Sequence, residues 1–246
     1  MTGAADRLGA TFARALAEAG YKVVIHYNTS ADKAQAFADK LKSDGHETAT
    51  VQADLTNRAD RARVIAEAGE KFGPLKVLVN NASTYDQDDL ATLKEDYWDA
   101  HFAIHAEAPI FLARDFAAQL PKDAKGNIVN VIDERVLNPY PAALSYNLSK
   151  SVLWTATRTL ANQLAPNIRV NAIGPGPILP EAGQSQAAYD ARSAEALLGS
   201  NAEPADAAAA LLYLLSAQKV TGQMLAIDAG EHLRWPEWRG PTPRQS

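Results

Sequence analysis

The sequence predicts an α/β fold, a doubly wound parallel sheet with helices on both faces. Along its 246 residues, short runs of β-branched and aliphatic residues alternate with longer Ala- and Leu-rich stretches at helical spacing. The short runs are apolar almost throughout, which is typical of parallel strands buried on both faces. A glycine turn containing Gly3 and Gly9 leads straight into the first helical stretch, as it does in Rossmann-type folds.

The predicted elements follow one another in a regular order. The first helix begins after the glycine turn and has Leu8, Phe12 and Leu16 on one face. Apolar runs predict strands at 22–26, 47–52, 75–80, 127–132, 169–173 and 224–228. Helical spacing predicts helices at 31–44, 58–72, 96–119, 146–165 and 204–215.

No linker, repeat or low-complexity block interrupts this pattern, so residues 1–246 are interpreted as a single domain. Within it, residues 184–198 are expected to form a helical lid over the site, in a lid region of about 180–200. An ordinary surface excursion is the alternative. The C-terminal tail at 231–246 contains two tryptophans, which would close a neighbour's pocket in an oligomer or pack on their own chain.

The first strand of the expected sheet is missing from the sequence. In a dinucleotide-binding fold the glycine turn follows a central strand, and here Met1 stands directly before it. We therefore expect a seven-stranded sheet with six strands in residues 1–246, and the seventh in about four to six apolar residues upstream. Without that strand, backbone groups beside the strand at 22–26 would be exposed.

Composition excludes several classes of protein. Hydrophobic residues make up 47% and charged residues 22%, as in ordinary soluble domains. No apolar run approaches the roughly 18 residues of a membrane span, and no signal peptide is visible. Zero cysteines exclude disulfides and thiolate chemistry and fit a cytoplasmic chain. With a net charge of −5 and no Lys/Arg cluster, neither nucleic acid nor membrane is an expected partner.

Several candidate site residues stand where the predicted strands end. Asn81 follows the strand at 75–80, Asp133 follows the strand at 127–132, and Pro175-Gly176 follows the strand at 169–173. The carboxyl ends of parallel strands meet at one edge of a sheet, where open α/β sheets bind ligands. These residues are therefore expected to share one site with the glycine turn, whose helix can hold a pyrophosphate at its N-terminus.

Tyr146 and Lys150 stand four residues apart on a predicted helix, so their side chains lie on one face and can converge on one ligand. A free phenol has a pKa of about 10, and a neighbouring ammonium would lower it. A Tyr-x-x-x-Lys spacing is common on solvated helices, and a glycine turn alone is equally often a cap. The coincidence of both with the strand-end residues favours a catalytic site.

Together these motifs resemble the short-chain dehydrogenase/reductase family over the whole chain. The matching features are Thr2-Gly3 with Gly9, Asp54-Leu55, Asn80-Asn81-Ala82, Tyr146 with Lys150, Pro175-Gly176 and Val220-Thr221-Gly222-Gln223. The resemblance implies a nicotinamide cofactor, Tyr146 as proton donor or acceptor, and Lys150 holding the nicotinamide ribose while acidifying Tyr146. The expected cofactor-binding residues are Gly3, Arg7, Leu8, Gly9, Tyr27, Asn28, Thr29, Ser30, Asp54, Leu55, Asn81, Ala82, Tyr146, Lys150, Pro175, Gly176 and Ile178.

Several residues depart from the usual family pattern. Arg7 interrupts the glycine turn, Ser83 and Tyr85 follow Asn-Ala, and Asp133 replaces the usual serine. These departures are similar to those of the pteridine reductases, and the endings Ile104-His105 and Gly230-Glu231-His232-Leu233-Arg234 are similar to the bacterial dihydromonapterin reductase branch. By this resemblance Tyr85 would stack on a flat pterin, and Ser83 and Arg7 would contact pterin and phosphates. The expected substrate residues are Arg7, Ser83, Tyr85, Asp133 and Tyr146. Asp133 beside Tyr146 would assist proton delivery, and a solvated strand-end or capping residue is its alternative role.

The segment after the strand at 22–26 indicates the cofactor. NAD sites commonly place an acidic residue there, about 20 residues after the glycines. This chain has Tyr27, Asn28, Thr29 and Ser30, with no acid before Asp32. Hydroxyl and amide groups can donate to a 2′-phosphate that a carboxylate would repel, so NADPH is the predicted cofactor. Capping of the next helix by Thr29 and Ser30 is compatible with that role.

His101 and His105 have a spacing that can bind zinc on a helix. No glutamate follows His101 and no third ligand is apparent, so no metal is expected. His105 is interpreted as a pocket or hydrogen-bonding residue, at the position where the family often has an asparagine that supports the lysine.

The sequence thus predicts an NADPH-dependent reductase of a dihydropteridine or dihydrofolate-like substrate. The alternatives are a short-chain carbonyl or 3-oxoacyl reductase and an inactive NADP(H)-binding sensor. Its other expected partners are copies of itself, as in the tetramers that related folds form.

Overall fold

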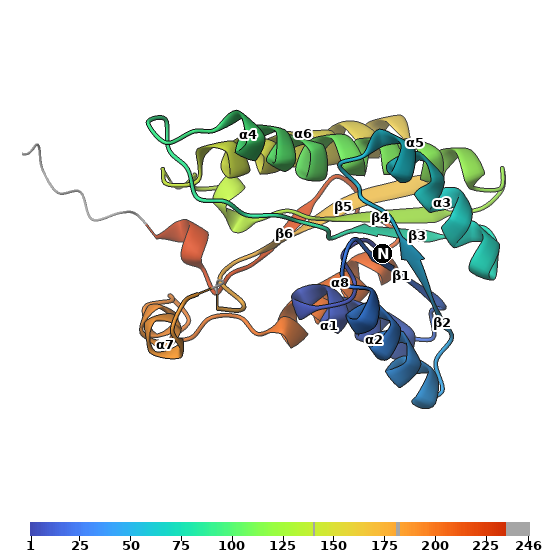
Figure 1. The fold of residues 1–246 in the computed structure, drawn as a ribbon, viewed down its shortest axis with the longest axis horizontal. Coiled ribbons are helices and arrows are strands. Elements are labelled where there is room, and N and C mark those ends of the chain that lie inside the picture. The colour runs from blue at the N-terminus through green and yellow to red at the C-terminus, as the bar shows by residue number, and fades with distance from the viewer. Residues whose placement is uncertain (140, 181–182, 235–246) are drawn as a thin grey trace, which may run out of the picture.

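The structure is a computed structural model that describes residues 1–139, 141–180 and 183–234. Two layers of helices enclose the strands (Figure 1). One layer contains α3 (Arg58–Phe72), α4 (Glu95–Phe102), α5 (Ala108–Gln119) and α6 (Leu144–Gln163). The other contains α1 (Arg7–Glu18), α2 (Ala31–Ser43) and α8 (Pro204–Ser216). The predicted α/β class with helices on both faces is confirmed.

All six predicted strands are present, and all pair in parallel. β1 (Val23–Tyr27) pairs with β2 (Thr48–Gln52) in one sheet. The second sheet has the order β3 (Val77–Asn80), β4 (Gly126–Val131), β5 (Ile168–Pro175) and β6 (Met224–Ile227). The strand order therefore reverses between β1 and β3, which is where a doubly wound fold opens its ligand crevice.

Between β1 and β3 the first residues of the chain connect the two sheets through their backbone. The Met1 amino group donates to the Val24 carbonyl at 2.9 Å, His26 N–H donates to the Met1 carbonyl at 3.0 Å, and Thr2 N–H donates to the Val79 carbonyl at 3.0 Å. Met1 and Thr2 border a cavity of about 390 Å³, whose apolar lining includes Leu16, Val24 and Ile65. The single continuous sheet expected from the sequence is thus two sheets in residues 1–246, and the upstream strand stays a prediction.

The long helix predicted at 96–119 is interrupted. α4 ends at Phe102, a π-turn η1 spans Ala103–Glu107, and α5 begins at Ala108. The cause is Pro109, which has no N–H to donate and whose ring would clash with the His105 carbonyl in a regular α-helix. The prediction missed this break, although Pro109 is visible in the sequence.

The lid region contains a helix shorter than predicted, α7 (Gln186–Ala194), set apart from the two helix layers (Figure 1). The 3₁₀ turn η3 (Glu231–Leu233) follows β6. Residues 181–182 and the predicted tail from 235 onward lie outside the described residues. No helix among the described residues is long and apolar enough to cross a membrane.

Candidate active site

A cleft of about 700 Å³ opens at the carboxyl ends of β1, β3, β4 and β5. It brings together most of the predicted site residues, from seven separate parts of the chain. Those that line it are Gly3, Arg7, Leu8, Gly9, Asn28, Leu55, Asn81, Ala82, Ser83, Asp133, Tyr146, Lys150, Pro175 and Gly176. Tyr27, Thr29, Ser30, Asp54, Tyr85 and Ile178 do not belong to its lining.

The glycine turn is packed too closely for any other residue at its two ends. A Cβ on Gly9 would lie 2.1 Å from the Gly3 carbonyl oxygen, and Gly3 itself has φ +59°. Arg7, the departure from the usual pattern, also has a positive φ of 50°. Its guanidinium donates to the Pro180 carbonyl at 2.9 Å, so Arg7 links the turn to the segment that leads into α7.

Asn81 and Thr2 hold the glycine turn against the end of β3. The Asn81 amide nitrogen donates to the carbonyls of Thr2 at 3.1 Å and Gly3 at 2.8 Å. In return, the Thr2 hydroxyl oxygen accepts the backbone N–H groups of Asn81 and Ala82, at 2.9 and 3.0 Å. The predicted cofactor-bordering residue Asn81 therefore also shapes the surface on which a cofactor would lie.

His26 supports the same turn from β1 and was not among the predicted site residues. Its Nδ1 accepts the Gly3 N–H at 3.1 Å and its Nε2 donates to the Ala53 carbonyl at 3.0 Å. Burial and the nearby chain terminus lower the pKa of His26 to about 4, so the ring is neutral. A histidine inside a strand reads as an ordinary strand residue, and the sequence carries no signal for this contact.

Three predicted catalytic residues converge in the cleft. The Tyr146 hydroxyl donates to the Asp133 carboxylate at 2.8 Å. The Lys150 ammonium lies 5.6 Å from the centre of the Tyr146 ring and donates to the Val131 carbonyl at 3.0 Å. Both side chains come from one face of α6, as their spacing predicts, while Asp133 stands just after β4 and caps η2 (Glu134–Val136).

The electrostatics of Tyr146 differ from the sequence expectation. Burial, followed by the charge and hydrogen bond of Asp133, raises the pKa of Tyr146 well above its usual value. Burial lowers the pKa of Lys150 to about 8. The expected acidification of Tyr146 by Lys150 is therefore outweighed here, because the carboxylate contacts the hydroxyl directly. Tyr146 is held as a neutral phenol, the form that can donate a proton.

Glu134 is a buried acid next to the site that the sequence did not reveal. It is only 4% exposed, and its Oε2 has no hydrogen-bond partner among the described residues. Burial, then the charge and hydrogen bond of Asp133, raise the pKa of Glu134 to about 10. A carboxylic acid that keeps its proton at neutral pH thus stands directly behind Asp133.

Tyr85 stands beside the cleft without belonging to its lining. Its ring meets the Tyr146 ring edge-on, with centroids 5.0 Å apart, and the Arg135 guanidinium lies 5.7 Å from the Tyr85 ring centre. The Tyr85 side chain is 39% exposed. Ser83 lies beside it in the cleft lining and is bonded to His105 at 2.8 Å.

The cleft end near β1 carries groups of both signs. Asn28 lines it, and Lys33 of α2 pairs with Asp6 of the glycine turn at 2.6 Å. Ser30 is the N-cap residue of α2, but its hydroxyl makes no capping hydrogen bond. Asp54 accepts Thr56 N–H at 2.9 Å in a local turn. Asp6 and Lys33 were not predicted as site residues.

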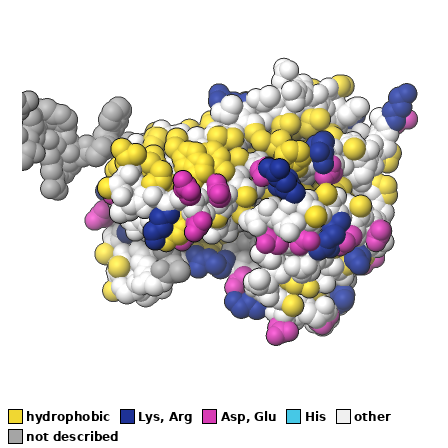
Figure 2. All heavy atoms as spheres, turned by 45° about the horizontal axis from the view of Figure 1, so that its top comes forward, with side chains coloured by type: hydrophobic (Ala, Val, Ile, Leu, Met, Phe, Trp, Pro, Cys, Tyr) yellow, Lys and Arg dark blue, Asp and Glu magenta, His cyan; other side chains and the backbone are white. Residues whose placement is uncertain are grey.

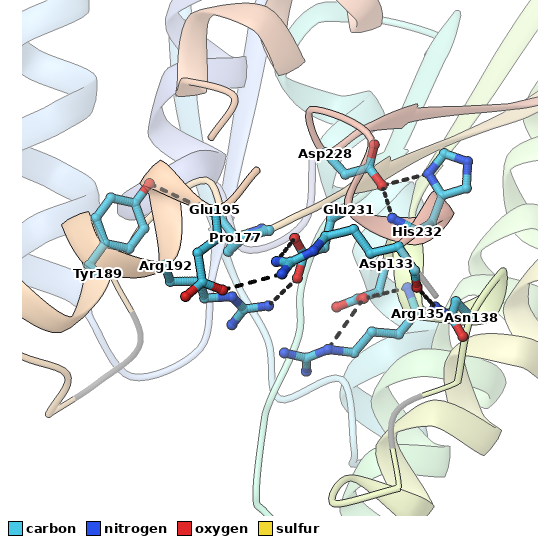
Figure 3. Close-up of polar contacts among 11 residues, drawn as sticks. Asp133, Arg135, Asn138, Pro177, Tyr189, Arg192, Glu195, Asp228, Glu231 and His232 are labelled. Atoms are coloured by element: carbon cyan, nitrogen blue, oxygen red, sulfur yellow. Dashed lines mark hydrogen bonds and ion pairs between the residues drawn. The ribbon is translucent and has the colours of Figure 1, made fainter. Parts of the chain in front are cut away.

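The helix α7, in the region predicted as a lid, is tied to the segment after β6 by ion pairs (Figure 3). Arg192 approaches Glu231 at 3.4 Å, and Arg234 approaches both Glu195 at 3.3 Å and Glu231 at 3.5 Å. The Tyr189 hydroxyl of α7 donates to the carbonyl of Ile178, three residues after the end of β5, at 2.8 Å. Figure 3 also shows Asp228 turned toward His232, with Nδ1 of that histidine at 2.6 Å.

Comparison with known proteins places the chain in a family. A family model described as enoyl-(acyl carrier protein) reductase matches residues 3–232. A short-chain type dehydrogenase/reductase of Picea abies is 31% identical over 203 residues, which cover 78% of this chain and 75% of that relative. The chain belongs to the short-chain dehydrogenase/reductase family. The predicted family, and with it an oxidoreductase, is confirmed.

Other members of this family resemble the chain over nearly its whole length. The granaticin polyketide synthase putative ketoacyl reductase 2 of Streptomyces violaceoruber is 30% identical over 241 residues, 95% of each chain. The solved structure of FolM alternative dihydrofolate reductase 1 from Brucella suis, in complex with NADP, is 40% identical. It covers 98% of this chain and 95% of its own, with a TM-score of 0.92.

Within the short-chain dehydrogenase/reductase fold, the departures noted in the sequence lie at one cleft. Arg7, Ser83 and Asp133 all line it, and Tyr85 contacts the ring of Tyr146 from the same loop as Ser83. Residues distant in sequence thus line one cleft, and of these Asp133 contacts the Tyr146 hydroxyl directly.

Proposed function

We propose that this short-chain dehydrogenase/reductase is an NADPH-dependent reductase of a dihydropteridine, of the dihydromonapterin, dihydrobiopterin or dihydrofolate kind. The observation that carries the proposal is the 2.8 Å contact between the Tyr146 hydroxyl and the Asp133 carboxylate, with the Tyr85 ring 5.0 Å from that of Tyr146. The 40% identity to a protein named alternative dihydrofolate reductase supports the same substrate class.

The residues suit reduction of a ring C=N bond, which needs a hydride at carbon and a proton at nitrogen. The cofactor, when bound, supplies the hydride. Tyr146, kept neutral by its raised pKa, donates the proton to the ring nitrogen. Asp133 accepts the hydrogen bond of the Tyr146 hydroxyl and so fixes the position of this hydroxyl until its proton passes to the substrate. Lys150, with a pKa lowered to about 8, remains mostly charged at neutral pH and holds the cofactor ribose.

The cleft fits a phosphorylated dinucleotide. Asn28 faces it just after β1, where no carboxylate stands before Asp32, and the Ser30 hydroxyl is not engaged as a helix cap. The N-terminus of α1 and the glycine turn lie at the same end of the cleft and suit a pyrophosphate. The FolM structures from Brucella suis and Brucella canis are both NADP complexes.

Steady-state oxidation of NADPH with dihydrobiopterin, dihydromonapterin and dihydrofolate, measured beside a panel of ketones and 3-oxoacyl thioesters, tests this function. We expect turnover of at least one pterin with kcat/KM at least about tenfold above any ketone. Brisk ketone reduction without pterin turnover would instead establish the carbonyl reductase alternative.

That alternative has one observation in its favour, since curated relatives include ketoacyl reductases at about 30% identity. Asp133 argues against it, because a carboxylate beside the tyrosine hydroxyl cannot donate a hydrogen bond to a ketone oxygen as a serine hydroxyl does. An inactive NADP(H) sensor, the third possibility, would bind NADPH and turn over neither substrate class.

We propose in addition that the chain forms a homo-oligomer, such as a tetramer. An apolar band covers the α4/α6 face (Figure 2), where a groove is lined by Trp98, Phe102, Leu148 and Val152 together with small residues of α6. Large side chains beside a row of small ones give a surface that can pack against its own copy about a two-fold axis. The Leu148 side chain is 42% exposed on this face. Light scattering should therefore show an oligomer for the wild type and a dissociated chain for Leu148→Glu, which places a charge on the apolar band.

A further inference from the structure

Two histidines lie between the loop at residues 83–88 and α6. His101 stands in the last turn of α4 and His105 in η1, and both side chains are fully buried. Their rings are 5.6 Å apart between centroids and within 17° of parallel. The stacked rings of His101 and His105, here called the histidine ladder, follow one another along the helix.

On the loop side, each histidine accepts a backbone N–H through Nε2. His105 Nε2 accepts Thr84 N–H at 3.3 Å and also lies 2.8 Å from the Ser83 hydroxyl, and His101 Nε2 accepts Asp86 N–H at 3.1 Å. The spacings match: two residues of extended chain advance about 6.6 Å, and four residues of helix advance about 6 Å. A loop that offers alternate amides is thus bound by histidines four residues apart, and exposure alternates along it from Ser83 to Asp88.

On the helix side, each histidine reaches a serine that directly precedes a catalytic residue. His101 Nδ1 lies 2.7 Å from the Ser145 hydroxyl, and His105 Nδ1 lies 2.9 Å from the Ser149 hydroxyl. Ser145 stands before Tyr146 and Ser149 before Lys150. Ser149 in turn donates to the Tyr146 carbonyl at 2.8 Å, and Ser145 donates to the Asp88 carboxylate.

The partners define the protonation of both rings. A backbone N–H can only donate, so each Nε2 must carry a lone pair and each Nδ1 must carry the hydrogen given to its serine. Burial is the main cause that lowers the pKa of both histidines; the Lys150 charge lowers both as well, and Asp86 and Asp88 oppose it only at His101. A proton on Nε2 would face the N–H of the loop and break the contact.

We propose that His101 and His105 are positioning residues that bridge the substrate loop to the catalytic helix and thereby set the separation of Tyr85 from Tyr146. This inference rests on the proposed function, because it assigns the loop to the substrate. The Tyr146 ring lies edge-on to both histidines, with centroids 5.8 Å from His101 and 5.2 Å from His105, and edge-on to Tyr85 at 5.0 Å. Movement of the ladder would change the width of the cleft at the reacting atoms.

Two kinds of substitution separate the two sides of the ladder. In His105→Asn and His101→Asn the side-chain amide can occupy the place of Nδ1 and still donate to the serine, but it cannot reach the loop. In His105→Gln and His101→Gln the amide oxygen can occupy the place of Nε2 and still accept the loop N–H, but the serine loses its donor. His46→Ala, in the turn between α2 and β2, is the control.

We expect the asparagine variants to raise the KM for the pterin about fivefold per lost bond with little change in kcat, and to increase hydrogen exchange at residues 83–88. The glutamine variants should retain KM and loop protection and lower kcat, because the support beside Tyr146 is lost. The NADPH Kd should stay within about twofold in all of them.

If the Asn and Gln variants shift the same parameter equally, or if the loop exchanges as in the wild type, the histidines are packing residues and the proposal is wrong. Nitrogen NMR of the wild type, with the His101 and His105 signals assigned, requires no variant; either of these two rings in the Nε2–H tautomer or charged at pH 7 would overturn the proposal. If the wild type reduces ketones and no pterin, the proposed function fails, while loop exchange and tautomer still decide the ladder.

Discussion

At Tyr146, burial and a neighbouring carboxylate both raise the pKa of the phenol. Burial disfavours the phenolate, and so does the Asp133 carboxylate that accepts its hydrogen bond at 2.8 Å. The site is therefore prepared to give a proton rather than to take one. We expect reduction to proceed without loss through neutral pH and the reverse oxidation to need alkaline conditions.

Replacing Tyr146 with Phe tests its role as the proton donor. Turnover should fall by at least about 100-fold, the typical contribution of a general acid. NADPH binding, followed by fluorescence titration, should change less than about threefold, because the ring remains in place. Tyr213→Phe, at an exposed tyrosine of α8, is the matched control. Undiminished turnover in Tyr146→Phe would remove the assignment.

Glu134 has a predicted effect on stability rather than on turnover. Its pKa is raised to about 10 in the folded protein from an ordinary 4.5, so the folded state binds a proton that the unfolded chain releases. The wild type is therefore expected to lose stability as the pH rises above about 4.5. Glu134→Gln removes that cost and should raise the free energy of unfolding at pH 8 by at least about 1 kcal/mol, with little gain at pH 4.

Urea unfolding of Glu134→Gln and of the exposed control Glu70→Gln at both pH values measures this effect. Equal stability of the wild type and Glu134→Gln at pH 8 would show that the carboxyl is ionised in the folded chain.

At the scale of elements, α7 is connected to the end of the chain by charge. Glu231 pairs with Arg192 of the helix and with Arg234 of its own segment, at 3.4 and 3.5 Å. These pairs are only partly exposed; pairs near the surface contribute about 0–1 kcal/mol and weaken with salt. They are thus suited to a lid that opens and closes at low cost.

Glu231→Gln should loosen this connection. We expect the KM for the substrate to rise about two- to fivefold with an unchanged kcat, and the wild type to approach the variant in high salt. Glu47→Gln breaks an exposed pair with Lys22 on the far side of the molecule and serves as the control. A salt-independent KM that is equal in both variants would mean that α7 does not act as a lid.

The elements also show what the sequence could and could not predict. Apolar runs placed all six strands, because strands buried on both faces leave a composition signal of their own. The spacing of Tyr146 and Lys150 and the position of Asp133 after a strand predicted that they would meet. Glu134 was not found, because a buried acid next to a strand-end acid has the same local pattern as a solvated one. The partners of His101 are likewise a loop and a helix that only tertiary structure brings to it.

At the scale of the whole molecule, the cavity of about 390 Å³ between β1 and β3 separates two sheets that would otherwise be one. The Met1 amino group beside it is buried, and this burial lowers its pKa to about 5. If a further residue were bonded to Met1, a neutral amide would replace this amino group, and no charge would be buried. Apolar side chains and two strand edges therefore face a space that suits one further strand.

A chain that carries four to six additional apolar residues before Met1 should be more stable. Burial of several aliphatic side chains at about 1.5–3 kcal/mol each outweighs the ordering of a short segment, and we expect the Tm to rise by at least about 5 °C. Thermal unfolding compared with a Gly/Ser extension of equal length provides the measurement. An apolar extension that stabilises no more than the polar one would show that the space does not accept a strand.

The π-turn at Ala103–Glu107 makes this part of the chain sensitive to length. A regular helix rotates about 100° per residue, and the wider turn absorbs the extra rotation that Pro109 forces on the chain. Deleting one residue here would turn everything before it by roughly a quarter of a revolution against everything after it. His101 would then face away from the Asp86 amide while His105 still reached the Thr84 amide. Variants that gain or lose a residue in this stretch should therefore be far rarer than those that exchange one.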